Sequence, residues 1–266
     1  MPNIKCIMNL YYSPDERLRL FIDENDWIVP VNGGSKLKDL NDPWINKKVI
    51  FDDSLNPNIS YLNGKLNEMT SLYFAYAHQD ILGDAEYVGL CHYRRRFEYH
   101  AVENVMAYKP DIICAKPIVM AFRVDRKIKL GTVEDGYKIC HIPKCWDLLE
   151  SKICSLEDRI FFDKWKNLNF LVAPCNMFIM KKSLFNKYCE YIFPILFDLV
   201  DKIDLSNVDG YQYRQLAFIA ERITSYWIAR YEELNPGKVY AIDYVYDSSL
   251  KPADAKDSRG NFVYER

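Results

Sequence analysis

Tyr87-Val-Gly-Leu-Cys-His-Tyr-Arg-Arg-Arg-Phe97 is the stretch that most clearly indicates how this chain is built. Its first half, Tyr87 to His92, is apolar enough to predict a buried strand, and three consecutive arginines follow it. Open α/β sheets bind their ligands at the carboxyl ends of the strands, so the arginines lie where a ligand is expected. Guanidinium groups hold phosphate oxygens in a bidentate fork and stay charged at any working pH. The segment therefore predicts a site for an anionic ligand.

Two other interpretations of this segment stay open. A run of charge often lies on the surface, paired with acidic side chains. Alternation along a straight strand would also turn Arg94 and Arg96 to one side and Arg95 to the other, so that at most two serve one pocket. Arginine interleaved with Tyr and Phe further resembles a surface that stacks single-stranded RNA. However, the chain has 35 Lys+Arg against 37 Asp+Glu and no RNA-recognition signature, so we expect no nucleic-acid partner.

Outward from this segment, short apolar runs alternate with helical periodicity, which is typical of an α/β fold. The expected strands are Ile4 to Leu10, Tyr87 to His92, Asp111 to Ala115, Asn176 to Met180 and Val239 to Val245. Three helices are expected. The first begins at Ser60 as an N-cap and continues through Tyr76, and the second runs from Ser183 to Lys202. The third places on one face Leu216, Ile219, Ala220, Ile223 and Trp227. Pro194 is expected to kink or divide the second of these helices.

Length and composition favour one globular domain. The chain has 266 residues, of which 49% are hydrophobic and 15% aromatic, enough for a sizeable core. We expect a single domain over residues 1–247 and a polar extension over residues 248–266, where apolar residues become sparse. The eight cysteines form no Cys-x-x-Cys pair, and neither a signal peptide nor a membrane-spanning run is recognisable. A cytoplasmic protein with reduced thiols is expected.

Metal and cofactor signals are weak. The four histidines have no metal-ligand spacing, and no strict Asp-x-Asp occurs; the nearest approach, Asp52-Asp53, is expected to be a pair of solvated loop acids. Gly-x-Ser-x-Gly, Gly-x-Gly-x-x-Gly and Walker motifs are missing. Gly33-Gly34 could allow a close backbone approach to a ligand or form an ordinary turn. We expect neither a metal nor a cofactor, so arginine would stabilise any departing diphosphate.

Several segments resemble, in order and spacing, a bacterial polysaccharide-biosynthesis glycosyltransferase family formerly catalogued as a domain of unknown function. They are Asn58-Ile-Ser60, Glu68-Met-Thr-Ser-Leu-Tyr73, Tyr87-Val-Gly-Leu-Cys-His-Tyr-Arg-Arg95, Asn176-Met-Phe-Ile-Met180, and the stretch from Tyr211-Gln-Tyr-Arg214 to Ala220-Glu-Arg222. The similarity spans residues 25–231, and the His-Tyr-Arg-Arg block is its most specific part.

This resemblance implies a glycosyltransferase of GT-A-like fold that acts in capsule, exopolysaccharide or O-antigen assembly. Some members transfer galactofuranose from its UDP donor with inversion, so galactofuranose is the expected sugar; another UDP-hexose, such as galactopyranose or glucose, is an alternative. The acceptor would be a cell-surface polysaccharide or lipid-linked glycan at the inner membrane face, with peripheral membrane contact. The amino terminus departs from the family pattern, because its first strand lacks a following His-Lys pair. A non-catalytic glycan- or nucleotide-binding protein is therefore a further alternative.

The resemblance also implies site residues. Negative charge grows on a leaving diphosphate in the transition state, and Arg94 and Arg95 with His92 would neutralise it. Inversion requires a carboxylate base, for which Asp209 and Glu221 are the candidates. Asp209 could instead be a helix-start carboxylate, and Glu221 could pair with Arg214 or Arg222. The other expected donor-binding residues are Tyr93, Asn58, Glu68, Asn176 and Arg214, and the expected acceptor-binding residues are His141 and Trp146.

Overall fold

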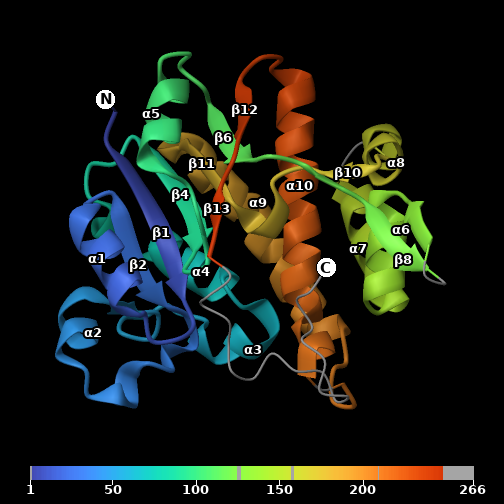
Figure 1. The fold of residues 1–266 in the computed structure, drawn as a ribbon. Coiled ribbons are helices and arrows are strands. Elements are labelled where there is room, and N and C mark those ends of the chain that lie inside the picture. Colours follow the sequence, from blue (N-terminus) through green and yellow to red (C-terminus); the bar gives the residue numbers. More distant parts are fainter. Residues whose placement is uncertain (1, 125–126, 157–158, 209, 248–266) are drawn as a thin grey trace.

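A computed structural model describes residues 2–124, 127–156, 159–208 and 210–247. Its centre is a mixed sheet with the strand order β12-β6-β11-β4-β1-β2-β3 (Figure 1). These strands are β1 (Ile4–Leu10), β2 (Ile28–Asn32), β3 (Ile50–Phe51), β4 (Tyr87–His92), β6 (Ile112–Ala115), β11 (Phe178–Lys181) and β12 (Val239–Ile242). All neighbouring pairs are parallel except those of β11, which runs antiparallel to β4 and β6. The predicted α/β class with a mixed central sheet is confirmed.

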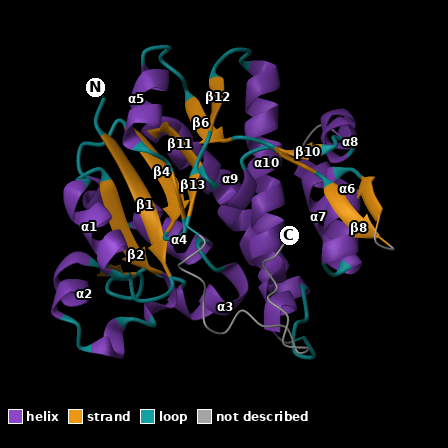
Figure 2. Cartoon of the chain, in the orientation of Figure 1, coloured by secondary structure: helices purple, strands orange, loops and turns teal. Residues whose placement is uncertain are grey.

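Helices cover both faces of this sheet (Figure 2). The described helices are α1 (Glu16–Glu24), α2 (Pro43–Lys48), α3 (Asn63–Leu66), α4 (Met69–Ala77), α5 (Tyr99–Met106), α6 (Val133–Cys140), α7 (Pro143–Leu156), α8 (Arg159–Lys166), α9 (Lys182–Lys202) and α10 (Gln215–Leu234). Alternation along β4 explains why there are two cores. Val88 and Leu90 join the core beneath α4, α9 and α10, whereas Tyr87 and Cys91 join the core beneath α1, α2 and α5.

A smaller layer lies beyond α10, built from α6, α7, α8 and four short strands (Figure 1). These strands are β7 (Ile118–Val119), β8 (Ala121–Val124), β9 (Lys127–Leu130) and β10 (Phe170–Leu171). β7 pairs with β10, and β8 pairs with β9, in both cases antiparallel. The layer shares the larger core, because Trp146 of α7 stacks on Trp165 of α8 with ring centres 6.0 Å apart and packs in the same cluster as α10.

The strand predictions hold with shifted ends. β1 and β4 have the predicted bounds, whereas the predicted strand 176–180 begins only at Phe178, because Asn176 belongs to a 3-10 turn, Pro174–Asn176. The predicted strand 239–245 is two strands, β12 and β13 (Val245–Tyr246), since the chain leaves the sheet edge to pair with β5 (Arg95–Arg96).

The helix prediction at Ser60 was wrong, and the division of a helix that was one of two expected effects of Pro194 does not occur. Ser60 does not cap a helix: it begins a 3-10 turn, Ser60–Leu62, and its hydroxyl bonds Asp52 instead. The helix expected from there is split into α3 and α4 by Asn67, whose φ is +51°. Pro194 does not divide α9, which is continuous over Lys182–Lys202. Side chains on both sides of Pro194 are buried, and this packing outweighs the backbone hydrogen bond that proline cannot make.

Candidate functional site

The sheet reverses its strand order between β1 and β4. The chain runs from β1 outward through β2 to β3, and then returns to place β4 on the other side of β1. A crevice forms at such a reversal, outside the carboxyl ends of the strands, and open α/β proteins use it for ligands. β4 ends here at His92, and the arginines follow directly.

The arginines lie in a tight reversal of the chain. Tyr93 and Arg94 form a turn, after which β5 returns antiparallel to β4, with His92 opposite Arg95. The alternation expected for a straight strand is therefore wrong for Arg94, which belongs to no strand and is only 6% exposed. Arg95 and Arg96, both half-buried, lie beside different rings: the guanidinium carbon of Arg95 is 4.8 Å from the ring centre of Tyr246, and that of Arg96 is 4.7 Å from Phe21. Arg94 and Arg95, which come first after the end of β4, stay the predicted donor-binding arginines.

The alternative of a solvated charge run does not fit this geometry. Within the described residues, neither Arg95 nor Arg96 makes an ion pair with an acidic side chain. Arg94 is buried, and its carbonyl accepts a 2.8 Å hydrogen bond from the backbone N–H of Asp247. Arg95 and Arg96 thus lie against aromatic rings, and no acidic side chain within the described residues pairs with either of them.

His92 faces the backbone of a turn. Its Nε2 lies 2.6 Å from the carbonyl oxygen of Cys175, so Nε2 carries a proton and donates it. Burial lowers the pKa of His92, and this outweighs the opposing effects of Glu68 and of the Cys175 carbonyl. A neutral imidazole at neutral pH follows, so the positive charge of the cluster comes from the arginines.

The turn that His92 contacts is strained. Ala173, Cys175 and Asn176 all have left-handed backbones, with φ of 49°, 60° and 55°. Such conformations are unfavourable for residues other than glycine and persist where the surroundings fix them, commonly at functional sites. Here the surroundings are three residues that the sequence predicted for the site: His92, Glu68 and Glu221.

Glu221 holds the same turn from α10. Its Oε1 accepts a 2.6 Å hydrogen bond from the backbone N–H of Cys175, and its Oε2 pairs with Arg222, one of the two arginines that the sequence left open. The Glu221 side chain is 17% exposed. Burial is the main cause that raises the pKa of the Cys175 thiol to about 12, and the negative charge of Glu221 is the next. The thiol therefore stays protonated and is no nucleophile.

Glu68 and Asn176 form a buried polar network. The Asn176 amide donates to Glu68 at 2.7 Å, and its carbonyl oxygen accepts from the Thr224 hydroxyl at 2.6 Å. The Tyr188 hydroxyl lies 2.6 Å from Thr224. Because Asn176 is fully buried, its hydrogen bonds fix the start of β11 rather than face solvent.

Arg214 and His141 meet at one aromatic pair. His141 stacks on Phe218 with ring centres 4.0 Å apart, and the guanidinium carbon of Arg214 lies 5.8 Å from the same ring and 5.9 Å from that of Tyr211. Arg214 also contributes to lowering the pKa of His92, which means that its charge reaches the cluster at the end of β4. The structure therefore brings a predicted donor residue and a predicted acceptor residue together at the start of α10.

Other predicted site residues lie elsewhere. Trp146 is fully buried between Tyr137 and Trp165, so it has no ring face for a sugar and is not part of the function proposed below. Asn58 shapes its own loop: its amide donates to the carbonyl of Leu55 at 3.0 Å, and its oxygen accepts from the N–H of Ser60. Asp209 and the extension 248–266 lie outside the described residues.

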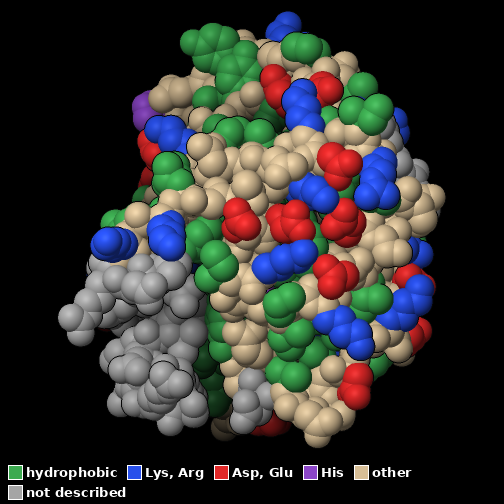
Figure 3. Space-filling model, turned by 90° about the vertical axis from the view of Figure 1, so that its right-hand side faces the viewer, with side chains coloured by type: hydrophobic (Ala, Val, Ile, Leu, Met, Phe, Trp, Pro, Cys, Tyr) green, Lys and Arg blue, Asp and Glu red, His purple; other side chains and the backbone are tan. Residues whose placement is uncertain are grey.

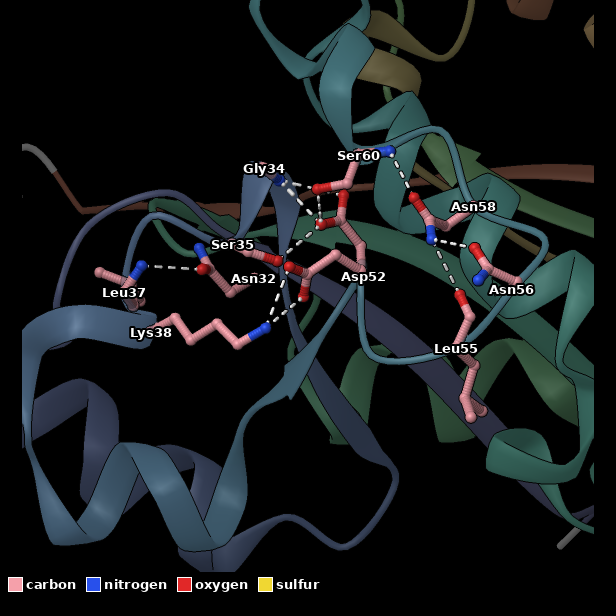
Figure 4. A network of polar contacts seen from close by, with 11 residues as sticks. Asn32, Gly34, Ser35, Leu37, Lys38, Asp52, Leu55, Asn56, Asn58 and Ser60 are labelled. Atoms are coloured by element: carbon pink, nitrogen blue, oxygen red, sulfur yellow. Dashed lines mark hydrogen bonds and ion pairs between the residues drawn. The ribbon is translucent and has the colours of Figure 1, made fainter.

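Asp52, expected to be a solvated acid, is fully buried and organises a loop (Figure 4). Its carboxylate accepts hydrogen bonds from the N–H of Gly34 and from the hydroxyls of Ser35 and Ser60. A Cβ at Gly34 would lie 2.8 Å from Asn63 Oδ1. Gly34 therefore allows the side chain of Asn63, rather than a ligand, to approach the backbone closely.

Sequence analysis overlooked two residues beside the arginines. Tyr244 and Tyr246, just after β12, lie next to Arg95, and burial raises the pKa of Tyr244. Two tyrosines spaced by two directly after β12 were the available signal. Their phenol groups add hydrogen-bonding capacity at the carboxyl edge of the sheet.

The described residues include no group of three His, Cys, Asp or Glu side chains arranged to hold a metal ion. Nor does any helix in the described part of the chain have the length and apolar character needed to span a bilayer.

A cavity of about 300 Å³ lies away from the arginines, between β6, α8, α10 and β12. Its walls are mainly apolar and include Phe161, Trp165 and Ile228, and none of the predicted site residues lines it. We place the candidate site at the arginines because the cavity lacks the convergent cations that a diphosphate requires.

Residues 18–232 match the family described as "Domain of unknown function (DUF4422)". The chain belongs to this family. No curated protein sequence matches it. Among solved structures, this chain resembles WbbM, which is described as a bifunctional glycosyltransferase in its apo form. The TM-score is 0.70, and the sequence identity is 19%. The similarity covers 94% of this chain and 47% of the WbbM chain, so this chain spans about half of WbbM and shares its fold there.

Proposed function

We propose that this DUF4422 protein is a glycosyltransferase of GT-A-like fold that transfers a hexose from a UDP donor. The observation that carries the proposal is the placement of Arg94 and Arg95 directly after β4, beside the reversal of strand order. Two guanidinium groups at this crevice suit a diphosphate. The fold shared with the WbbM glycosyltransferase supports the same reaction class.

The proposed mechanism gives the arginines the main electrostatic role. As the acceptor hydroxyl attacks the anomeric carbon, the bond to the diphosphate breaks and negative charge grows on the departing UDP. Arg94 and Arg95 stabilise that charge without reorganising, because packing already holds them. His92 is neutral and acts as a positioning residue, since it fixes the strained turn at Cys175.

The proton of the acceptor hydroxyl requires a base. Both oxygens of Glu221 already accept hydrogen bonds that hold the turn and Arg222. We therefore favour Asp209, whose neighbours Gly210–Arg214 lead into α10, as the base and assign Glu221 a positioning role. His141, stacked on Phe218 next to Arg214, is the proposed acceptor contact.

The finer assignment follows the family resemblance. The proposed donor is UDP-galactofuranose, transferred with inversion to a polysaccharide or lipid-linked glycan at the cytoplasmic face of the membrane, and the reaction proceeds without a metal. This protein would work in capsule, exopolysaccharide or O-antigen assembly.

The experiment is a donor panel. UDP release is followed with UDP-galactofuranose, UDP-galactose and UDP-glucose, with and without EDTA, and products are identified by mass. Turnover with UDP-galactofuranose that EDTA leaves unchanged is expected. Loss of turnover in EDTA would overturn the metal-free mechanism. Turnover with UDP-galactose or UDP-glucose alone would show that this sugar nucleotide, and not UDP-galactofuranose, is the donor. Tight UDP binding without turnover would favour a non-catalytic binding protein.

A further inference from the structure

Arg95 lies between two strands that come from distant parts of the chain. Within β5 it is paired with His92 of β4 on one side and with Tyr246 of β13 on the other. Figure 1 shows how the chain reaches this position: after β12 it leaves the sheet edge and passes toward the carboxyl end of β4 as β13. The hairpin that carries the arginines is therefore covered by a segment that comes much later in the chain.

β13 supplies most of the backbone pairing of this hairpin. β5 has only two residues and a single paired position with β4, whereas both of its residues pair with β13, because Val245 lies opposite Arg96. The N–H of Asp247 also donates to the carbonyl of Arg94 at 2.8 Å. A two-stranded hairpin this short is marginal without a further strand. We therefore expect β13 to stabilise the reversal that follows β4.

Two tyrosines of the same segment contact the side chain of Arg95. Its guanidinium carbon lies 4.8 Å from the ring centre of Tyr246. Burial raises the pKa of Tyr244, and a hydrogen bond from Arg95 to the Tyr244 hydroxyl acts in the opposite direction. An aromatic ring and a phenol oxygen, rather than a carboxylate, thus hold this guanidinium group.

Other basic side chains of the protein have acidic partners. On the side of the molecule formed by α6, α7 and α8, acidic and basic side chains are interspersed (Figure 3), and their ion pairs include Lys166 with Glu150 and Lys138 with Glu134. Such a pair neutralises the cation and occupies its N–H donors. An aromatic ring attracts the cation without neutralising it, and arginine has several N–H donors, so the bond to Tyr244 leaves others for phosphate oxygens.

We propose that Tyr244 and Tyr246 are positioning residues, which fix the guanidinium group of Arg95 in an orientation that leaves its bidentate fork open to a diphosphate. This inference rests on the proposed function and adds to it how Arg95 is held while its charge stays available. Arg95 is half-buried and Tyr246 is 42% exposed, so a ligand can reach both from solvent. Loss of either contact would leave the guanidinium group mobile, and ordering it would then weaken ligand binding.

The test is calorimetric titration of the full chain with UDP. Tyr246→Ala and Tyr244→Phe should each weaken UDP binding by about three- to tenfold, the effect of one cation–π contact or one hydrogen bond. Tyr246→Phe keeps the ring and should bind UDP like the unchanged protein. Tyr240→Ala is the matched control: this tyrosine of β12 stacks on Tyr108, with ring centres 5.6 Å apart, and its loss should leave UDP binding unchanged.

A double-mutant cycle separates positioning from general stabilisation. In an Arg95→Ala background, Tyr246→Ala should cause no further loss of UDP affinity, because the side chain that it positions is gone. A second readout needs no UDP: the arginine reagent phenylglyoxal should label Arg95, located by mass spectrometry, faster in Tyr246→Ala than in the unchanged protein or in Tyr240→Ala. Thermal melting confirms that each variant is folded, and Tyr244→Phe, which removes a single hydroxyl, stays informative if Tyr246→Ala unfolds.

Four results would overturn the proposal: unchanged UDP affinity in both Tyr246→Ala and Tyr244→Phe, a loss in Tyr246→Phe equal to that in Tyr246→Ala, the same loss with and without Arg95, or unchanged labelling of Arg95. Failure of the proposed function gives a different result. The unchanged protein would then bind no UDP, while the labelling rates would still show whether the two tyrosines hold Arg95.

Discussion

The Nε2 of His92 lies 2.6 Å from the carbonyl oxygen of Cys175, which joins the end of β4 to a turn 83 residues further along the chain. The N–H of the same Cys175 donates to Glu221, and the next residue, Asn176, bonds Glu68. Three elements, β4, α4 with its preceding residue and α10, therefore converge on one strained turn beside Arg94 and Arg95. We propose that this convergence fixes the end of β4, from which the chain continues into Arg94 and Arg95, and so supports the proposed reaction.

Replacing Arg94 or Arg95 by Ala is expected to lower turnover by about 10²-fold or more, because each change removes a fixed charge from the departing diphosphate. Arg95→Lys should recover only part of the loss, since an ammonium group cannot form the bidentate fork. Steady-state UDP release measures the effect. Arg159→Ala, which changes an arginine whose side chain is 70% exposed, is the control and should retain full turnover. Undiminished turnover in both Arg94→Ala and Arg95→Ala would contradict the assigned role.

The pH dependence of stability should report on His92. Burial lowers the pKa of His92, so below about pH 6.5 the unfolded chain binds a proton there before the folded chain does. The free energy of unfolding therefore falls as the pH is lowered through this range, and His92→Gln should make the fall shallower. Urea unfolding at about pH 7.5, 6.5 and 5.5 measures it. His100→Gln, which changes an exposed histidine of α5, should leave the slope unchanged. Equal slopes in the unchanged protein and in His92→Gln would exclude this linkage.

Asn176→Ala is expected to destabilise the fold by about 2–4 kcal/mol, because it removes one hydrogen bond each from buried Glu68 and buried Thr224 and puts Ala in a left-handed backbone. Denaturant unfolding gives the difference. Asn167→Ala removes an exposed side chain that donates a hydrogen bond to the Asp163 carbonyl, and it should change stability by less than about 0.5 kcal/mol. A loss at Asn176 as small as that at Asn167 would show that the network contributes little.

The two candidate bases should behave differently. Asp209→Asn is expected to lower kcat by about 10²–10⁴-fold while UDP affinity stays the same, because a general base acts only in the chemical step. Glu221→Gln should chiefly lower stability, by about 1–3 kcal/mol, since buried Arg222 loses its counter-charge. Calorimetric UDP binding, turnover and melting are compared for both variants. If Glu221→Gln abolished turnover at unchanged stability while Asp209→Asn did not, the assignment would be reversed.

The sequence predicts the sheet well where apolar runs are uninterrupted. β1 and β4 were located to the residue, because each is a short apolar run followed by polar residues. β2 was missed, since Pro30 and Asn32 disguise a strand that is fully buried in the sheet. The reversal at Tyr93 and Arg94 was also missed, because no glycine or proline marks it.

The candidate site could be predicted from residue type, but the burial of its residues could not. Residue type and position at the end of a strand indicated His92, Arg94 and Arg95, which lie close together at the carboxyl end of β4, and their role in binding stays a prediction. Burial is a tertiary property that residue type does not determine, so Trp146 and Asp52 were expected at the surface although both are fully buried. The protonation of His92 likewise depends on neighbours that are distant in sequence.

A crystal structure of the protein soaked with UDP tests the central claim most directly. The account predicts diphosphate oxygens within about 2.7–3.2 Å of guanidinium nitrogens of Arg94 or Arg95, at the carboxyl end of β4. UDP bound elsewhere, with both guanidinium groups out of reach of its phosphates, would contradict it.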